Sequence, residues 1–259
     1  MPNIKISMIT VSLNSEKTIE QTIKSVLEQD YANLEYIIID GGSTDRTLEI
    51  VNQYKSKIDV IVSEKDNGIS DAFNKGIRRA TGDVIGIINS DDTLLHDALQ
   101  AVADNYDDET DVYRGNIIFY NPQTGFTCRE IPSMKFPKLP FFIHVAHQGT
   151  FVAKKAYDKY GVYDEKIKYS MDLDFLMRVY LAKGKMKKID FDMATFRQGN
   201  TTADALKKKK QEFFYFLEKN GCNKLQSHFY YAYLVCMDWA KKILNLFGND
   251  FKQKLRYRN

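Results

Sequence analysis

Short apolar runs alternate with amphipathic segments along the first ninety residues of the chain. The run at 34–40 (LEYIIID) is almost continuously apolar, which is typical of a parallel strand buried on both faces. Strands are predicted at 4–11, 34–40, 58–62 and 83–88, and helices at 16–29 and 70–80. A further helix is predicted after Ser43 or Thr44 as its cap, with Thr47, Ile50, Val51 and Tyr54 facing inward. Strands that alternate with helices at this spacing predict an open, doubly wound α/β sheet.

The pattern changes after residue 90. A helix is expected to begin near Leu94, and residues 112–120 and 126–131 are expected to form a hairpin. Helical spacing returns at 171–183, and two aromatic-rich helices are predicted at 206–219 and 226–247. We therefore expect an α/β domain over residues 1–205 and a basic, aromatic-rich helical extension over 206–259.

The composition is that of an ordinary folded protein. The chain has 259 residues, of which 44% are hydrophobic and 27% charged, so a disordered or fibrous chain is excluded. No stretch approaches the roughly 20 apolar residues of a membrane-spanning helix. The N-terminus lacks a secretory signal, so we expect a cytoplasmic location. The three cysteines are scattered, which favours neither a disulfide framework nor a zinc site.

Charge is unevenly divided between the two predicted parts. Residues 206–259 hold 12 Lys and Arg against 4 Asp and Glu, whereas the rest of the chain holds 25 against 30. A basic and aromatic tail suits an interfacial helix on an anionic membrane surface. The same aromatic residues could equally pack on the α/β domain or on a second subunit in a homodimer. Nucleic acid is not an expected partner, because the basic residues form no recognisable nucleic-acid-binding module.

Polar clusters follow three of the predicted strands: Ser12 with Asn14, the turn 40–43, and the segment 89–92. The carboxyl ends of parallel strands lie at one edge of a sheet, where ligands bind near the point at which strand order reverses. The sequence therefore predicts one shared site at this edge.

Asp91 and Asp92 are the sharpest chemical feature in the chain. Adjacent carboxylates after an apolar strand repel each other unless a positive charge lies close by. Mg²⁺ or Mn²⁺ would supply that charge and keep positions open for phosphate oxygens. The alternative is that one of the two acids caps the helix expected near Leu94.

Other candidates each have a structural alternative. The turn Asp40-Gly41-Gly42-Ser43 lets backbone N–H groups approach a ligand, or is a tight turn with a capping serine. Asp71, Asn74 and Lys75 share one helix face, which is usually a solvated face. Asp172 lies near the start of a predicted helix. It could serve as a general base, or its charge could simply stabilise the helix through the helix dipole. His147 by itself is more typical of a hydrogen-bonded structural residue.

Taken in order, these motifs resemble the family 2 glycosyltransferases of GT-A fold, as found in bacterial surface polysaccharide synthesis. The resemblance runs from about residue 4 to about residue 200. It rests on Val11-Ser12-Leu13-Asn14-Ser15-Glu16, Ile39-Asp40-Gly41-Gly42-Ser43-Thr44-Asp45, Asn67-Gly68, Ala72-Phe73-Asn74-Lys75-Gly76, Ala80-Thr81-Gly82-Asp83, Asn89-Ser90-Asp91-Asp92, His147-Gln148 and Met171-Asp172-Leu173-Asp174-Phe175-Leu176-Met177-Arg178.

The resemblance implies a GT-A domain with a mostly parallel mixed sheet, and it implies roles for individual residues. Asp172 would be the catalytic base of an inverting transfer, and Asp91 and Asp92 would contact the ribose and a divalent cation, Mn²⁺ or Mg²⁺. His147 and Gln148 would line the pocket. The residues implied in binding the donor nucleotide are Val11, Ser12, Asn14, Asp40, Gly42, Asn67, Gly68, Asp71, Lys75, Asn89, Ser90 and Asp91.

The implied reaction moves a sugar from a nucleotide-diphosphate donor, with UDP favoured, to a hydroxyl of a glycan or lipid-linked glycan. A lipid-linked acceptor would give the basic tail a purpose at the inner face of the cytoplasmic membrane. The sequence departs from the family pattern at Asn89, where the first acid of the metal motif is usual, and at Met171, where an acid often precedes the base.

Two other functions fit a nucleotide site on an α/β sheet. Nucleotidyltransferases usually carry a glycine-rich basic loop after the first strand, which Ser12-Leu13-Asn14-Ser15 lacks. A non-catalytic nucleotide-sugar-binding subunit would keep the fold without the chemistry. The presence of Asp40, Asp91, Asp92 and Asp172 favours an enzyme over that alternative.

Overall fold

The computed structural model describes residues 4–134, 145–198, 212–219 and 221–244. The chain divides into two compact units, residues 1–199 and 200–259. The boundary that we predict at 205/206 lies outside the described residues and stays a prediction. Within the described residues, no helix is both long enough and apolar enough to cross a lipid bilayer.

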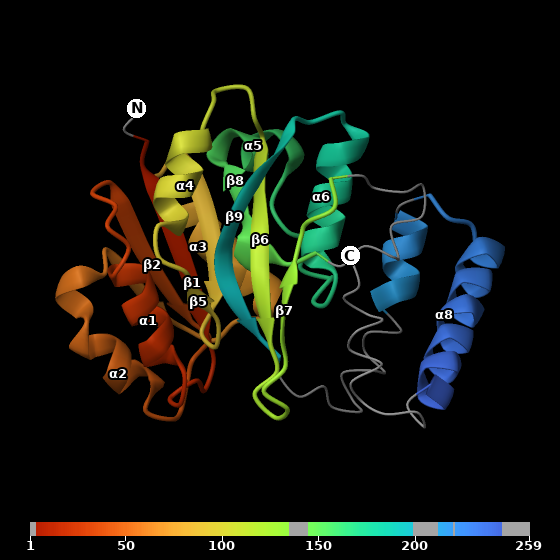
Figure 1. Ribbon diagram of the computed structural model, residues 1–259, viewed down its shortest axis with the longest axis horizontal. Helices are drawn as coiled ribbons and strands as arrows, with labels where there is room; N and C mark the ends of the chain where they lie inside the picture. The colour runs from red at the N-terminus through yellow and green to blue at the C-terminus, as the bar shows by residue number, and fades with distance from the viewer. Residues whose placement is uncertain (1–3, 135–144, 199–211, 220, 245–259) are drawn as a thin grey trace. The chain divides into compact units, whose positions relative to one another are not determined.

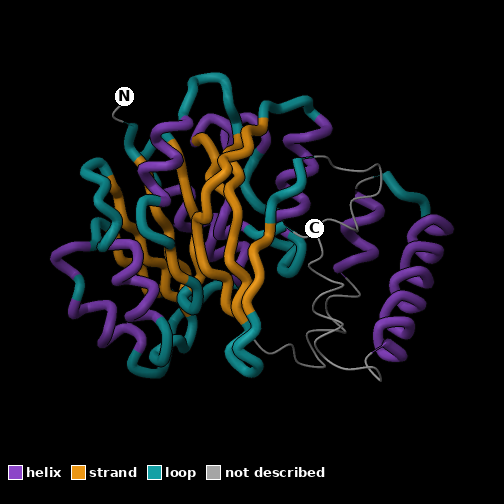
Figure 2. The backbone as a smooth tube through the Cα atoms, in the orientation of Figure 1, coloured by secondary structure: helices purple, strands orange, loops and turns teal. Residues whose placement is uncertain are grey.

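The first unit is an α/β sandwich around a mixed sheet (Figures 1 and 2). Its strands are β1 (Ile6–Ser12), β2 (Leu34–Asp40), β3 (Val60–Ser63), β4 (Val84–Asn89), β5 (Thr93–Leu94), β6 (Val112–Tyr120), β7 (Thr127–Glu130), β8 (Thr150–Ala153) and β9 (Met186–Arg197). Its helices are α1 (Ile19–Leu27), α2 (Thr47–Gln53), α3 (Ile69–Arg79), α4 (Ala98–Asn105), α5 (Lys154–Tyr160) and α6 (Met171–Leu181), with short 3₁₀ turns η1 (Lys55–Lys57) and η3 (His147–Gly149).

The sheet order creates a switch point beside β1. Among the described strands the order is β3-β2-β1-β4-β8-β6-β9-β5, and β7 pairs with β6. The chain moves outward from β1 through β2 to β3, and then crosses back to β4 on the other side of β1. Strands β1 to β4 are parallel, with Val11 level with Ile39 and Asn89. The loops after β1 and β4 therefore diverge at one edge of the sheet, which is where ligands bind in such folds.

Helices cover both faces of the sheet. On one face, α1, α2 and α4 bury apolar side chains against β1, β2 and β4, including Ile19, Ile23 and Val26 of α1. On the other face lie α3, α5 and α6 (Figure 1). The ring of Tyr163, in the loop between α5 and α6, joins α3 to α6, because its centroid lies 5.6 Å from those of both Phe73 and Phe175.

The start of one predicted helix is wrong. The helix expected near Leu94 begins only at Ala98, because Thr93 and Leu94 form the short strand β5. Their backbones pair with Thr195 and Ala194 of β9. The acidic pair therefore precedes a strand, and neither Asp91 nor Asp92 caps a helix. Contact with β9, which is distant in sequence, overrides the local helical pattern.

The second unit contains a helix over residues 212–219 and the long helix α8 (Lys224–Leu244). The predicted helices at 206–219 and 226–247 agree with these elements where they overlap, and residues 206–211 and 245–247 lie outside the described part. Several large apolar side chains of α8 are exposed, with Leu225 at 82%, Phe229 at 71% and Trp239 at 65%.

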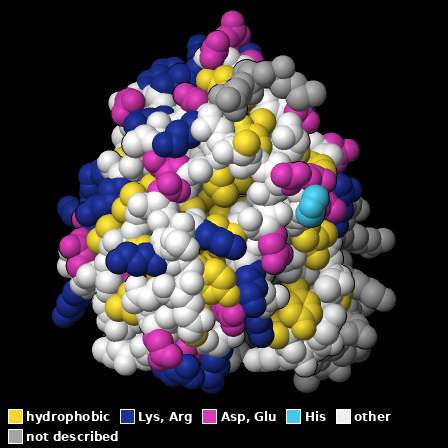
Figure 3. Space-filling view, turned by 90° about the vertical axis from the view of Figure 1, so that its left-hand side faces the viewer, with side chains coloured by type: hydrophobic (Ala, Val, Ile, Leu, Met, Phe, Trp, Pro, Cys, Tyr) yellow, Lys and Arg dark blue, Asp and Glu magenta, His cyan; other side chains and the backbone are white. Residues whose placement is uncertain are grey.

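The side of the first unit that carries β2, α1 and α2 has no region of one charge sign. Figure 3 looks onto this side, and Lys and Arg lie interspersed with Asp and Glu across it. This distribution agrees with the small net charge of residues 1–205. The basic excess of the chain belongs to the tail.

Candidate functional site

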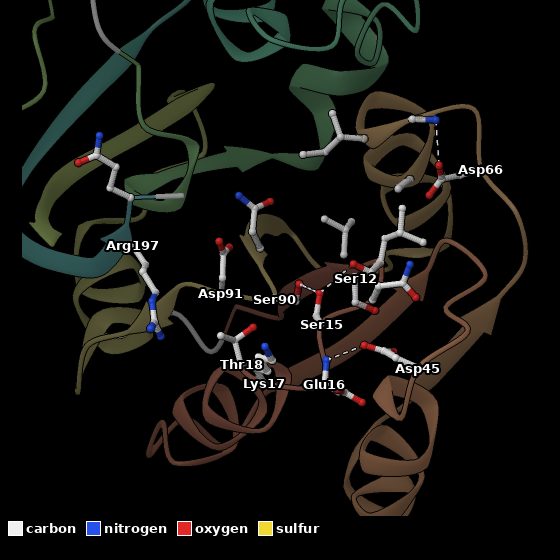
Figure 4. Close-up of a pocket in the computed structure, with 18 residues that line it drawn as sticks. Ser12, Ser15, Glu16, Lys17, Thr18, Asp45, Asp66, Ser90, Asp91 and Arg197 are labelled. Carbon is white, nitrogen blue, oxygen red and sulfur yellow. Dashed lines mark hydrogen bonds between the residues drawn. The ribbon is translucent and has the colours of Figure 1, made fainter. Parts of the chain in front are cut away.

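A cavity of about 810 Å³ opens at the switch point between the ends of β1 and β4. Figure 4 shows its walls, with Ser12 at the end of β1 and Ser15 after it, Ser90 and Asp91 following β4, and Arg197 at the end of β9. Its volume is in the range that protein cavities use to enclose small molecules. The residues that line it are Val11, Ser12, Leu13, Asn14, Ser15, Glu16, Lys17, Thr18, Asp45, Asp66, Gly68, Ile69, Ala72, Asn89, Ser90, Asp91, Arg197 and Gln198.

Five of the twelve predicted donor-binding residues lie outside this lining. The other seven line the cavity and come from three separate stretches of sequence: Val11, Ser12, Asn14, Gly68, Asn89, Ser90 and Asp91. Asp40, Gly42, Asn67, Asp71 and Lys75 do not line it. Asp92, His147, Gln148 and Asp172 lie outside the lining as well.

Asp40 is held by its own turn and by serines of the two neighbouring strands. Its side chain is fully buried, and its two oxygens accept hydrogen bonds from the hydroxyls of Ser12, Ser43 and Ser63 and from the backbone N–H groups of Gly42 and Ser43. Ser43 therefore bonds to Asp40 and does not cap α2, whose N-terminal residue Thr47 donates its N–H to Asp45 instead. Asp40 shapes the loop beside the cavity and does not face into it.

The polar stripe on α3 is also engaged, and it is not a solvated face. Asp71 is 6% exposed and Asn74 1% exposed. Asp71 accepts from the backbone N–H of Asn67 and pairs with Lys75 at 3.6 Å. Asn74 exchanges two hydrogen bonds with the backbone of Tyr163, at 2.9 and 3.0 Å. These residues fasten α3 to its neighbours.

The two adjacent acids have different surroundings. Asp91 is exposed to the cavity, whereas Asp92 is 1% exposed. Asp92 accepts from the backbone N–H of Arg197 at 2.8 Å and from Gln148 Nε2 at 2.6 Å. Burial, together with the neighbouring Asp91 charge, raises the pKa of Asp92 to about 7. Partial enclosure by the cavity wall raises the pKa of Asp91 as well.

These surroundings indicate which of the two acids could hold a cation. Asn89 Oδ1 is buried and has no hydrogen-bond partner among the described residues, and it belongs to the same cavity wall as Asp91. A carboxylate and an amide oxygen are oxygen ligands that suit Mg²⁺ or Mn²⁺. No group of three or more His, Cys, Asp or Glu in the described part of the chain could enclose a metal ion. A cation here would need further ligands, and phosphate oxygens are the usual ones.

Two cationic side chains also line the cavity, and neither belongs to the predicted site. Arg197 lies at the end of β9, close enough to Asp91 to interact with its charge. Lys17 lies just before α1 (Figure 4). The sequence signal for Arg197 is weak, because β9 joins the switch point only through its pairing with β5 and β6.

The predicted base is linked to the acidic pair by one turn. His147 Nδ1 lies 3.4 Å from Asp172 Oδ2, and the next residue, Gln148, bonds to Asp92. The side chains of His147 and Asp172 are 11% and 15% exposed. Asp174, the other acid in this helix turn, is fully buried and pairs with Arg178 at 3.1 Å. Asp172 is therefore the more accessible of the two carboxylates.

An open α/β sheet with a polar cavity at its switch point is a common arrangement for binding a small molecule. The glycosyl transferase family 2 model matches residues 7–167, which is more than half of the chain. The chain therefore belongs to glycosyl transferase family 2, and it is a glycosyltransferase of GT-A fold, as its motifs predict.

Relatives and solved structures agree with this assignment. A PGL/p-HBAD biosynthesis glycosyltransferase of Mycobacterium tuberculosis is 28% identical over 180 residues, which cover 67% of this chain and 69% of the relative. The Bacillus subtilis protein TuaG, assigned to teichuronic acid biosynthesis, is 39% identical over 98 residues, or 37% of this chain and 39% of the relative.

Two solved structures share the fold. TarS 1–349 of S. aureus in complex with UDP-GlcNAc has a TM-score of 0.64 at 19% identity, covering 86% of this chain and 69% of that one. The mannosyltransferase PcManGT from Pyrobaculum calidifontis, in complex with GDP-Man and Mn²⁺, has a TM-score of 0.62 at 17% identity, covering 83% and 64%. At these identities the likeness concerns the fold alone.

Proposed function

We propose that this glycosyltransferase moves a sugar from a nucleotide-diphosphate donor, with UDP favoured, to a hydroxyl of a glycan or lipid-linked glycan. The observation that carries the proposal is the cavity wall in which Asp91 and Arg197 lie together with Asn89 Oδ1, which has no hydrogen-bond partner in the described part of the chain. A divalent cation and a diphosphate would satisfy these three groups at once. The solved relatives in complex with UDP-GlcNAc and with GDP-Man and Mn²⁺ support this choice of ligand.

The residues in and beside the cavity have different proposed roles, which follow from their positions. Asp91 and Asn89 would hold Mn²⁺ or Mg²⁺, which when bound stabilises negative charge on the leaving diphosphate. Arg197 and Lys17 add positive charge to the same cavity. Asp92, which is buried and hydrogen-bonded, holds the loop in place and is not our choice of metal ligand.

The transfer itself would proceed with inversion. The Asp172 carboxylate accepts the proton of the acceptor hydroxyl as that oxygen attacks the anomeric carbon of the donor. The bond between the anomeric carbon and the diphosphate breaks on the opposite face, and the nucleoside diphosphate leaves with the electron pair. If Asp172→Asn retained full transfer activity with an intact fold, another group would have to be the base.

A thermal-shift screen of UDP, GDP, CDP and ADP, each with and without Mn²⁺, tests the donor site. We expect one nucleotide to raise the melting temperature in a metal-dependent way. Asp91→Asn should abolish this rise without changing the melting temperature of the free protein, and the exposed Asp108→Asn serves as the matched control. A response to no nucleotide would contradict the proposal and favour a non-catalytic subunit.

The names of the relatives support a role in cell-surface polysaccharide synthesis. For the tail we propose peripheral contact with an anionic membrane at the cytoplasmic face, with a homodimer as the alternative. The exposed Leu225, Phe229 and Trp239 and the charge balance of residues 206–259 support an interfacial contact.

Liposome flotation separates the two uses of the tail. The full chain should float with vesicles that contain anionic lipid, and replacing Phe229 and Trp239 by serine should abolish flotation. Leu181→Ser, on an exposed residue of α6, is the control. Unchanged flotation of the double variant, with a loss of dimer in light scattering, would favour the homodimer.

A further inference from the structure

The turn η3 places two neighbouring side chains against two separate carboxylates. Gln148 Nε2 donates to Asp92 Oδ2 at 2.6 Å, and His147 Nδ1 lies 3.4 Å from Asp172 Oδ2. Asp92 follows β4 and Asp172 lies in the first turn of α6. A single turn therefore contacts both the acidic motif and the proposed base, which are 80 residues apart in sequence.

Close packing holds this turn in place. A Cβ atom on Gly149 would lie 2.8 Å from the Gly115 carbonyl oxygen, so the turn lies directly against β6. Gln148 is 3% exposed. The His147 ring packs edge-on against Phe73, with 5.2 Å between the ring centroids. Such packing leaves both side chains little freedom to change rotamer.

The hydrogen-bonding state of His147 is unusual for a structural residue. A carboxylate accepts hydrogen bonds, so the contact with Asp172 is a hydrogen bond in the tautomer of His147 that carries its proton on Nδ1. Nε2 is then an acceptor, and it is buried without a partner among the described residues. An unsatisfied buried polar atom costs free energy, which a purely structural position would avoid with an apolar ring. The Nδ1 contact with Asp172 offers a reason to keep histidine here.

We propose that His147 is a positioning residue, which orients the Asp172 carboxylate for proton removal while Gln148 ties the same turn to Asp92. The inference rests on the proposed role of Asp172 as base. Small displacements of a catalytic group lower the rate strongly, so the effect should fall on kcat and not on donor binding.

Two substitutions separate positioning from packing. His147→Phe keeps a ring against Phe73 but removes both nitrogens, whereas His147→Asn places an amide N–H near the position of Nδ1. With the nucleotide sugar that the wild-type protein turns over best, we expect His147→Phe to lower kcat about 10- to 100-fold at unchanged KM for the donor. His147→Asn should recover most of that loss. His96→Asn, at a side chain 73% exposed, is the control.

The contact itself can be measured without turnover. In ¹⁵N NMR of the full chain, the His147 ring should show the Nδ1-protonated tautomer, and Asp172→Asn should shift its Nδ1 signal. If His147→Phe kept more than half of the wild-type kcat, the positioning role would be refuted. Equal losses in the Phe and Asn variants, in step with a lower melting temperature, would also overturn it and indicate packing alone.

Failure of the proposed function gives a different result. If the wild-type protein turned over no UDP- or GDP-sugar while the NMR coupling between His147 and Asp172 was present, the contact would stand and the catalytic assignment would fall. Turnover by the wild-type protein with no NMR coupling and no effect of His147→Phe would overturn the inference alone.

Discussion

Glu35 gives the most direct test of how the sheet is stabilised. It lies in β2 beside Ser7 of β1, and its side chain is only 7% exposed. Its carboxylate accepts from the hydroxyl of Ser7, from the backbone N–H and hydroxyl of Thr81, and from Lys5 Nζ. Burial by itself would raise the pKa of Glu35, but these donors outweigh burial and lower the pKa from 4.5 to about 2.

The magnitude follows from the pKa. The difference between 4.5 and about 2 corresponds to about 3 kcal/mol, at about 1.4 kcal/mol for each pH unit. Because the folded-state pKa is lowered, this stabilisation is present above pH 4.5 and is lost as the pH falls toward 2. Glu35→Gln should therefore lower the free energy of unfolding by about 3 kcal/mol at pH 7, and by much less at pH 3.

Urea unfolding of both proteins between pH 7 and pH 3 measures this difference. The exposed Glu28 provides the control, because Glu28→Gln should leave the free energy of unfolding unchanged. A loss below about 1 kcal/mol at pH 7 would refute the reasoning, and so would a loss that stays constant across the whole pH range.

Three further substitutions test the packing and the cavity. Gly76→Ala should destabilise the protein by about 1–3 kcal/mol in urea unfolding, because its Cβ would lie 2.5 Å from Ile9 Cγ2; an unchanged midpoint would contradict this. Asn74→Ala should cost about 2–4 kcal/mol, since it leaves the buried backbone groups of Tyr163 without partners, and a cost below 1 kcal/mol would exclude that role. Arg197→Gln should weaken nucleotide-diphosphate binding about tenfold in calorimetry without changing the melting temperature, because its backbone bond to Asp92 remains; unchanged affinity would place the diphosphate elsewhere.

The first ninety residues were predictable because each parallel strand is an apolar run of its own. β2 begins and ends at the predicted residues, 34 and 40. β5 was not predictable, because its two residues become a strand only by pairing with β9, about 100 residues later. The local hydrophobic pattern predicts an element when the element's own residues form its buried face. The pattern does not predict a strand that forms only because a partner distant in sequence supplies its hydrogen bonds.

The site was predictable in location and less so in orientation. Strand ends brought Ser12, Asn89 and Asp91 together, as expected from the topology. Whether a polar residue faces the cavity or the interior depends on partners that the motif does not contain. Asp40 faces inward because Ser43 and Ser63 supply donors for it, and Arg197 reaches the cavity because of the course of β9.

The acidic pair shows why neighbouring carboxylates need separate tests. Asp92 fastens the end of β4 to η3 and β9 through Gln148 and the backbone of Arg197, while Asp91 remains exposed to the cavity. A substitution at either position can lower activity, but the physical causes differ. Loss of Asp91 removes charge from a loop that keeps its shape, and loss of Asp92 frees the loop that presents that charge. Activity measurements alone would not distinguish the two acids. Unfolding measurements made beside them separate the proposed cation ligand, Asp91, from Asp92, which holds the loop in place.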